Sequence, residues 1–385
     1  MAEPLRVGFV AGESSGDQLG AALIMALRAR APELRCFGVA GAKMRAAGCE
    51  AWASSDELAV MGLFEPLRRL PRLMRLRRML RARFAAERPH AFVGIDAPAF
   101  NLGLEAQLKA LGLRTVQFVS PQVWAWRQHR IRAIARACDL VLCLLPFETD
   151  FYSRHGVRAL FVGHPLADQI PLDVDRAAAR RELGIAAEAT LVAILPGSRI
   201  GEVERLGSDF IAAATWLEQR RPDLQFIAPM ASAAVRAVFE AQLARANVQH
   251  MRLLDGQAQR ALAASNVVLV ASGTATLETL LSKRPMVAAY RFSALTAFVI
   301  RKLGLVKVPY FSQPNLLAGR RLVPEFLQEA VTAESLGAAL LAELDDPARA
   351  TELEAEFRRV HEHLRRGGAE LAANAILELV RERAP

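Results

Sequence analysis

An aspartate and an arginine each follow a short apolar run, the position at which parallel α/β proteins usually bind their ligands. Asp96 ends the run Ala91–Ile95, and Arg199 follows the tight turn after Thr190–Leu195. A carboxylate there can act as a general base, and a guanidinium can pair with a diphosphate through its planar fork. The alternatives are that Asp96 only caps a turn and that Arg199 is a solvated residue of a helix-capping turn.

Two turns of the second half have the composition of phosphate-binding turns. Gly197 and Ser198 lie directly before Arg199 in the first of these turns. The second turn is Ser272, Gly273 and Thr274, and it precedes an expected helix. Free backbone N–H groups and the positive end of a helix dipole attract anions at such places. Ordinary helix capping is the alternative for both turns.

Glu278 lies one turn into that expected helix, where a carboxylate can bind the two hydroxyls of a ribose. The alternative is a solvated helix face. The chain shows no acidic cluster with the spacing of metal ligands. We therefore expect a nucleotide diphosphate to be held by helix ends and Arg199, with no metal and no other cofactor.

The first half has its own small polar turn after the run Leu5–Val10. Its residues are Gly12 and then Glu13, Ser14, Ser15, Gly16 and Asp17. The glycines would let the backbone approach a ligand. We assign this turn to the acceptor side, meaning the part of the site that binds the molecule to which a group is transferred. The spacing is not G-x-G-x-x-G, which makes a dinucleotide site a weak reading. Small polar residues without any ligand are the alternative.

Aromatic side chains follow another strand end, and they suit contact with a sugar or an acyl chain. Ser120 comes directly after the run Thr115–Val119, and Trp124 and Trp126 follow within the next six residues. We place all three on the acceptor side. A packing role for one of the two rings is the alternative.

The stretch Leu67–Arg83 carries eight arginines and no acid, interleaved with leucines and methionines at helical spacing. Pro71 suits the start of this helix. Such a basic amphipathic helix can lie on an anionic membrane, through Arg68, Arg69, Arg72, Arg75, Arg77 and Arg78. A core-facing stripe with a solvated face is the alternative. Nucleic acid is disfavoured because no aromatic residue is interleaved with these arginines.

The elements that position these residues are recurring βα units. Apolar residues make up 52% and charged residues 23% of the 385 residues, which is ordinary globular usage. The net charge of +9 favours anionic partners. The four cysteines have no metal-ligand spacing, so we expect reduced core thiols. No uncharged apolar run reaches the roughly 18 residues that span a bilayer, and the N-terminus does not read as a signal peptide.

Short apolar runs followed by helical patterns indicate an α/β protein with two doubly wound, Rossmann-like domains facing a cleft. Before residue 165 we also expect a strand at Leu140–Leu144. After it we also expect strands at Leu224–Ala228 and Val267–Val270. We place an acceptor- and membrane-binding domain at 1–168 and a UDP-sugar-binding domain at 169–345. From Thr332 onward only helices are expected, with a tail at 346–385 that packs on the first domain or on a partner subunit.

Several of these segments together resemble the lipid-A-disaccharide synthases, a family of inverting glycosyltransferases with the GT-B fold. The match covers roughly residues 5–330, and its order and number of motifs are highly specific. The matching segments are Ala11–Asp17, Met61–Glu65, Gly94–Pro98 with Phe100 and Asn101, Val119–Arg127, Gly163–Pro165, Leu195–Arg199, Ala271–Ala275 and Pro314–Gly319.

The resemblance implies a reaction, a location and residue roles. The donor is expected to be UDP-2,3-diacylglucosamine and the acceptor 2,3-diacylglucosamine 1-phosphate, giving a β-1,6-linked disaccharide phosphate and UDP. Asp96 is implied as the base, and Arg199, the segment Ser272–Glu278 and Asn315 as the donor side. Family members act at the cytoplasmic face of the inner membrane, and some form dimers that exchange C-terminal segments.

One position departs from the family pattern Asp-x-Pro-Asp-Phe-Asn. Ala99 replaces the second acid, so Asp96 must act without a carboxylate partner there. Two rival functions remain. One is another UDP-sugar enzyme of the same fold, such as a 2-epimerase or the transferase that builds the peptidoglycan disaccharide lipid. The other is a noncatalytic protein of the membrane surface that retains a nucleotide-binding fold.

Overall fold

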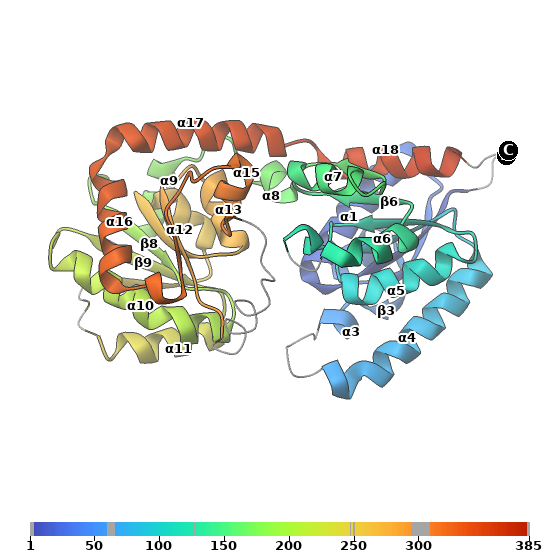
Figure 1. Ribbon diagram of the computed structural model, residues 1–385, viewed down its shortest axis with the longest axis horizontal. Coiled ribbons are helices and arrows are strands. Elements are labelled where there is room, and N and C mark those ends of the chain that lie inside the picture. The colour runs from blue at the N-terminus through green and yellow to red at the C-terminus, as the bar shows by residue number, and fades with distance from the viewer. Residues whose placement is uncertain are drawn as a thin grey trace. The chain divides into compact units, whose positions relative to one another are not determined.

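The computed structural model describes residues 4–59, 66–125, 128–246, 248, 251–293 and 309–382. The chain divides into two compact units, Met1–Asp168 with Leu364–Pro385, and Gln169–His363. Each unit contains one parallel β-sheet with helices packed against it (Figure 1). The expected α/β class with two doubly wound sheets is confirmed.

The first unit contains a seven-stranded sheet of order β3-β2-β1-β4-β5-β6-β7. Its strands are β1 (Arg6–Ala11), β2 (Arg35–Ala40), β3 (Glu50–Ser54), β4 (Ala91–Ile95), β5 (Arg114–Phe118), β6 (Leu140–Cys143) and β7 (Ala159–Phe161). Every neighbouring pair is parallel. The chain therefore returns through a helix after most strands, as apolar runs alternating with helical patterns predict.

Helices cover both faces of this sheet. They are α1 (Glu13–Arg30), α2 (Ala42–Ala46), α3 (Asp56–Ala59), α4 (Pro66–Glu87), α5 (Pro98–Lys109), α6 (Ile131–Ala137), α7 (Pro146–Ser153), α8 (Pro165–Gln169) and α18 (Gly368–Arg381). One face is buried under α1 and α18, through residues such as Leu23, Ile24 and Ile376. The other is buried under α4 to α7.

The second unit repeats the design with six parallel strands in the order β10-β9-β8-β11-β12-β13. They are β8 (Leu191–Leu195), β9 (Gln225–Met230), β10 (Met251–Asp255), β11 (Val267–Ala271), β12 (Met286–Tyr290) and β13 (Glu325–Leu327). The helices are α9 (Arg176–Leu183), α10 (Ile200–Glu218), α11 (Ala233–Leu243), α12 (Ala258–Ala264), α13 (Thr274–Leu281), α15 (Gln313–Ala318), α16 (Ala333–Asp345) and α17 (Pro347–Leu364). One face of the sheet is buried under α10, α11 and α16.

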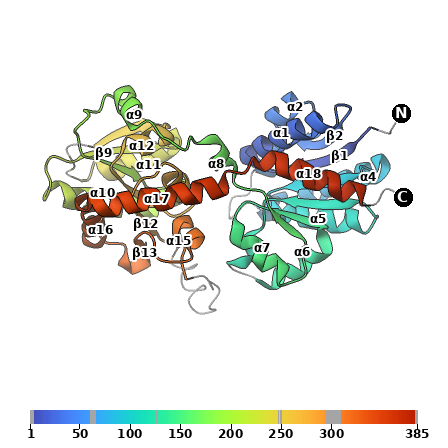
Figure 2. The same cartoon turned by 90° about the horizontal axis from the view of Figure 1, so that it is seen from above.

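The helical tail predicted at 346–385 is confirmed as two helices, which are divided between the units. Figure 2 shows α17 and α18 as consecutive helices at the red end of the chain. Most of α17 belongs to the second unit, whereas α18 packs beside α1 in the first. The Asp168 carboxylate caps α18, because it accepts from the N–H groups of Gly367 and Gly368 at 3.0 Å each.

Two details of the predicted elements are wrong. The arginine-rich helix α4 begins at Pro66, so Pro71 lies inside it and does not start it. Six strands were also missed. Four of them, β3, β7, β10 and β13, are edge strands that are short and partly exposed, so they lack a clear apolar run. The inner strands β2 and β12 contain Gly or Ala residues, which have low β propensity.

Candidate active site

The predicted functional turns lie at the switch points of the two sheets. In each sheet the strand order reverses between two adjacent strands, β1 and β4 in the first unit and β8 and β11 in the second. Open parallel sheets bind ligands in the crevice outside the carboxyl ends of these two strands. The turns at Gly12 and Asp96 follow β1 and β4, and those at Gly197 and Ser272 follow β8 and β11.

The turn after β1 is joined to the end of β4. The Gly12 N–H donates to the Ile95 carbonyl at 3.4 Å. Glu13, which starts α1, has a φ of 58° and is exposed together with Ser14 and Ser15. No described side chain caps this end of α1. These three polar residues are therefore accessible at the switch point of the first unit.

Asp17, which we predicted on the acceptor side, has a structural role. Its buried carboxylate accepts three hydrogen bonds, from the N–H groups of Gly41, Lys43 and Met44 at 2.9–3.0 Å. It therefore caps α2 instead of facing a ligand. Gly16 is buried beside it, and a Cβ built there would make only an ordinary contact with the Ile95 carbonyl oxygen at 3.6 Å.

Asp96 is held in an uncommon backbone conformation. Its φ is 51° and that of Ala97 is 43°, so two successive non-glycine residues are left-handed. Such strain persists only where surrounding contacts enforce it. Here the Asp96 N–H donates to the Phe118 carbonyl at 2.9 Å, and its own carbonyl accepts from Asn101 Nδ2 at 2.8 Å and Gln117 Nε2 at 3.2 Å.

The surroundings of Asp96 favour its use as a base. Its side chain is half-buried, and this desolvation raises the pKa of the carboxyl above its ordinary value. A carboxylate with a raised pKa accepts a proton more readily at neutral pH. Ala99, in the first turn of α5, supplies no second acid, and its carbonyl accepts from the Arg77 guanidinium at 3.2 Å.

The segment after β5 is tied to α7 by its polar atoms. Ser120 is buried, and its hydroxyl lies 3.0 Å from the Tyr152 hydroxyl. The Trp124 indole N–H donates to Glu148 Oε1 at 3.0 Å, and its ring packs edge-on against Phe147. These contacts hold Ser120 and Trp124 against α7, and Trp124 is half-exposed. Trp126 lies outside the described residues.

Glu148 contacts Trp124 of this segment, although we did not predict a role for it. Burial raises the pKa of its carboxyl to about 7, and Oε2 accepts from the Leu145 N–H at 3.0 Å, which caps α7. The sequence carried a signal for this role. An apolar run ends just before Pro146, and an acid follows two residues after this proline. This pattern is typical of the start of a helix that is capped by the carboxylate.

The turn after β8 presents a cation. Gly197 has a φ of 132°, and the N–H groups of Ser198 and Arg199 both donate to Glu202 Oε2, at 3.0 and 3.3 Å. Those two amides are therefore already occupied. The Arg199 side chain is 80% exposed, and its only close acid is Glu202 Oε1 at 3.3 Å among the described ion pairs. An anion at this turn would therefore bind the Arg199 guanidinium more than the backbone amides.

The turn after β11 is open. Gly273 has a φ of 154°, and a Cβ built there would meet no atom within 4 Å. Among the described residues no side chain caps the N–H groups of α13, and such groups attract anions. Ser272 donates its hydroxyl to the Phe311 carbonyl at 2.9 Å. Glu278 is half-buried one turn further, and desolvation raises the pKa of its carboxyl.

Asn315, which the resemblance placed on the donor side, is fully buried and structural. Its Oδ1 accepts from the N–H groups of Leu322 and Val323 at 2.7 and 2.8 Å, and its Nδ2 donates to the Val323 carbonyl. The amide therefore shapes the loop after α15. Helix α15 itself packs against α13.

Helix α4 combines a core-facing stripe with an exposed basic face. Leu76, Leu80 and Phe84 are buried at helical spacing against the first sheet. On the exposed side Leu70 and Met74 are 49% and 53% accessible. The arginines interleaved with these two residues are Arg72, Arg75 and Arg78, which are exposed, and Arg77, which lies half-buried over the Phe100 ring. The side chains of Arg68 and Arg69 lie outside the described residues.

Three further features bear on the function. No helix in the described part of the chain is long and apolar enough to cross a membrane. Within the same part, no three His, Cys, Asp or Glu side chains form a group that could hold a metal ion. The four cysteines are buried and unbridged.

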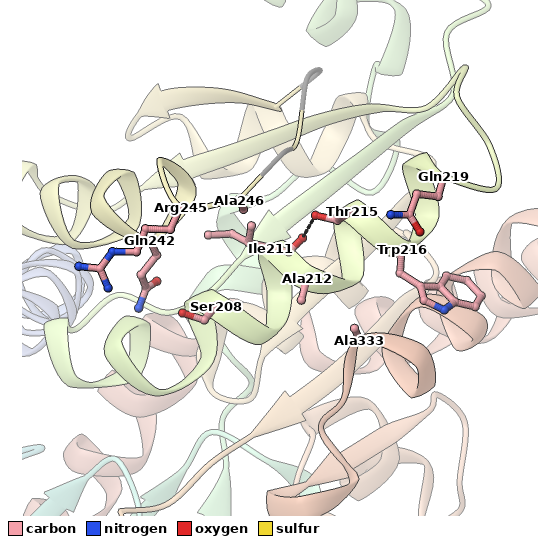
Figure 3. Close-up of a pocket in the computed structure, with 10 residues that line it drawn as sticks. All are labelled: Ser208, Ile211, Ala212, Thr215, Trp216, Gln219, Gln242, Arg245, Ala246 and Ala333. Atoms are coloured by element: carbon pink, nitrogen blue, oxygen red, sulfur yellow. Dashed lines mark hydrogen bonds between the residues drawn. The ribbon is translucent and has the colours of Figure 1, made fainter.

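A cavity of about 480 Å³ lies in the second unit, away from the strand ends. One side is α10 and its end, and the lining residues are Ser208, Ile211, Ala212, Thr215, Trp216, Gln219, Gln242, Arg245, Ala246 and Ala333 (Figure 3). Ser208 is nine residues beyond Arg199, about 13 Å along the helix. The cavity is therefore separate from the switch point.

Solved structures of similar fold are glycosyltransferases and related sugar-nucleotide enzymes. The glycotransferase of kitacinnamycin matches 98% of this chain and 99% of its own with a TM-score of 0.64 at 18% identity. The UDP-GlcNAc 2-epimerase of Neisseria meningitidis, bound to UDP-GlcNAc, covers 98% and 100% with a TM-score of 0.64 at 11% identity. The calicheamicin glycosyltransferase gives 0.60 at 14% identity, with full coverage of both chains. The fold is therefore GT-B.

Relatives of known name are much closer in sequence. The lipid-A-disaccharide synthase of Sodalis glossinidius is 53% identical over 98% of this chain and 99% of its own. That of Pseudomonas aeruginosa is 51% identical over the whole of both chains. The family model of lipid-A-disaccharide synthetase matches residues 7–379. The chain belongs to the lipid-A-disaccharide synthetase family and is a glycosyltransferase of lipid A biosynthesis.

Proposed function

We propose that this protein transfers 2,3-diacylglucosamine from UDP to 2,3-diacylglucosamine 1-phosphate with inversion, forming the β-1,6-linked lipid A disaccharide 1-phosphate and UDP. The observation that carries the proposal is Asp96, which has a half-buried carboxyl group and a backbone carbonyl held by two amide side chains at the switch point of the first sheet. The names of the relatives, lipid-A-disaccharide synthases at about half identity, support the choice of product.

Asp96 acts as the general base. It takes the proton of the attacking acceptor hydroxyl while the hydroxyl oxygen forms a bond to the anomeric carbon of the donor sugar. The bond from that carbon to the diphosphate oxygen breaks on the opposite face, and UDP leaves with the electron pair. Attack opposite the leaving group inverts the anomeric configuration. One base suffices for this displacement, so the absence of an acid at Ala99 does not prevent it.

The second unit binds the donor. Arg199 pairs with the diphosphate and stabilises the charge that develops on it as UDP departs. The uncapped N–H groups at Gly273 and Thr274 bind the same anion, and Glu278 accepts hydrogen bonds from the ribose hydroxyls. The exposed cation and the helix end supply the charge that a divalent metal supplies in other enzymes. We therefore propose that turnover needs neither a metal nor another cofactor.

The protein acts on the cytoplasmic face of the inner membrane, where its acylated substrates reside. Helix α4 supplies the contact, with Leu70 and Met74 entering the interface and the exposed arginines meeting anionic headgroups. The C-terminal segment, which passes from the second unit to the first, is the part that two copies would exchange in a homodimer. Light scattering of the purified protein measures its oligomeric state directly.

One assay tests the reaction. Purified protein is incubated with both acylated sugars in the presence of EDTA, and the products are identified by mass spectrometry. UDP with a disaccharide monophosphate is the expected result. An isomerised UDP-sugar without UDP release would identify an epimerase, and UDP binding without any turnover would identify a noncatalytic binding protein. If turnover occurs only after addition of Mg²⁺, the proposed metal independence is refuted, whereas the proposed reaction is not.

A further inference from the structure

A buried polar cluster contacts the backbone carbonyl of Asp96. The proposed reaction does not use it. Asn101 and Glu105 of α5 and Gln117 of β5 are all fully buried. Within the described part of the chain, each leaves one oxygen without a hydrogen-bond partner, namely Asn101 Oδ1, Glu105 Oε1 and Gln117 Oε1. Buried polar atoms are nearly always paired, so three adjacent orphan acceptors require a donor.

The three side chains converge on Gly94. A Cβ built on Gly94 would overlap Glu105 Oε1 and come within 3.0 Å of Asn101 Cβ and Cγ. Gly94 also lies opposite Gln117 in the parallel register of β4 and β5, so both positions face the same side of the sheet. The absence of a side chain at Gly94 therefore makes room for the Glu105 carboxyl beside the two amides that hold the Asp96 carbonyl.

A neutral Glu105 would supply the missing donor. Complete burial raises the pKa of its carboxyl to about 8, so the group is protonated at neutral pH. Cys138 Sγ donates to Oε2 at 3.2 Å, which leaves the hydroxyl at Oε1. The charged groups nearby are engaged elsewhere: Lys109 pairs with Asp139 at 3.1 Å, and Arg77 donates to the Ala99 carbonyl.

We propose that Glu105 is a positioning residue, whose carboxylic acid donates a hydrogen bond to Asn101 Oδ1 and thereby fixes the amide that holds Asp96. With Oδ1 fixed, Asn101 Nδ2 must point at the strand ends, where it donates to the carbonyls of Val10, Ile95 and Asp96. A flipped amide would place oxygen against those carbonyl oxygens. This inference rests on the proposed role of Asp96 as the base.

Two substitutions test the hydrogen bond. Glu105→Gln keeps a neutral donor of nearly the same shape, whereas Glu105→Leu keeps the volume without a donor. We expect the Gln variant to retain kcat within about threefold of wild type and the Leu variant to lose roughly tenfold to hundredfold, since small misplacements at a reacting group cost that much. The KM for the UDP donor should stay unchanged in both, because the donor-binding residues lie in the second unit.

The pH profile separates positioning from folding. Wild-type kcat should fall above pH about 8 as Glu105 ionises, and Glu105→Gln should lack this alkaline limb. A Gln variant as slow as the Leu variant, a Leu variant with wild-type kcat, or a limb retained in the Gln variant would each overturn the proposal. Asp96→Asn is assayed in parallel: full turnover there refutes Asp96 as the base, whereas a slow Asp96→Asn beside an unaffected Glu105→Leu refutes only the positioning role.

Discussion

Gly12 and Ala97 lie against each other at the switch point of the first sheet. A Cβ built on Gly12 would come within 2.8 Å of the Ala97 Cβ, closer than real Cβ atoms approach. The two residues belong to turns 85 positions apart in sequence, and the Gly12 N–H also bonds to the Ile95 carbonyl next to Asp96. The missing side chain of Gly12 therefore determines how closely the polar turn of α1 approaches Asp96.

Gly12→Ala should disturb the site more than it disturbs the fold. The added methyl must push the Ala97 turn away, and Asp96 moves with it, so we expect kcat to fall by roughly tenfold or more. Steady-state kinetics and thermal unfolding are measured together. Gly201→Ala is the control, because its Cβ meets only the end of the flexible Arg205 side chain. Wild-type kcat in Gly12→Ala would show that this contact does not position Asp96.

Asp96→Asn should abolish most of the turnover and leave UDP binding intact. The amide has nearly the shape of the carboxylate but cannot accept the proton, and loss of a general base costs roughly a hundredfold to ten-thousandfold. The variant is assayed for kcat and, by calorimetry, for the Kd of UDP. Unchanged turnover would remove Asp96 as the base, and weakened UDP binding would mean that the residue acts on the donor.

Arg199→Ala should act on the donor side with little effect on stability. The side chain is 80% exposed, so its removal leaves no cavity. A hydrogen bond to a charged group contributes about 1.5–3 kcal/mol, so kcat/KM for the UDP donor should fall roughly tenfold to hundredfold. Arg220→Ala, which removes an exposed arginine stacked over Trp216 on the same unit, is the control. Wild-type donor kinetics would count against Arg199 as a diphosphate ligand.

Neutralising the exposed face of α4 should weaken membrane binding. Replacing Arg72, Arg75, Arg78 and Arg81 by Gln removes four positive charges, each worth about 1 kcal/mol at an anionic surface. Sedimentation with vesicles containing anionic lipid measures the loss. The control replaces the exposed Arg35, Arg132, Arg136 and Arg154, which changes the net charge equally. Equal losses in both variants would indicate that net charge, not this helix, governs binding.

Glu148 should make stability depend on pH between about 5 and 7. Burial raises the pKa of its carboxyl from 4.5 to about 7, so the folded protein holds a proton that the unfolded chain has released. This contribution is complete below the unfolded pKa and is lost as pH rises through the folded one, by about 1.4 kcal/mol per pH unit at most. Relative to Glu148→Gln, the Tm of wild type should therefore fall over this range. A constant difference in Tm would show that Glu148 is ionised in the folded protein.

The sequence by itself determined the fold class and the turns at which the candidate site residues lie. The predicted run Ala91–Ile95 has the same bounds as β4. The turns at Gly12, Asp96, Gly197 and Ser272 all follow strands that border a switch point. Such features can be read because they are local. A buried parallel strand is a continuous apolar run, and the ligand-binding edge of a parallel sheet is always at its carboxyl ends.

Only the tertiary structure decided which polar residues serve the fold and which remain exposed. Asp17 and Asn315 have side chains that suit a ligand and a cap equally well, and the choice was made by the N–H groups of Met44 and Val323, which lie on other segments. Glu148 and Glu105 likewise take partners from other segments, namely Trp124 and Cys138. A polar side chain takes the partner that the packed chain brings within about 3 Å, and spacing along the sequence does not contain that distance.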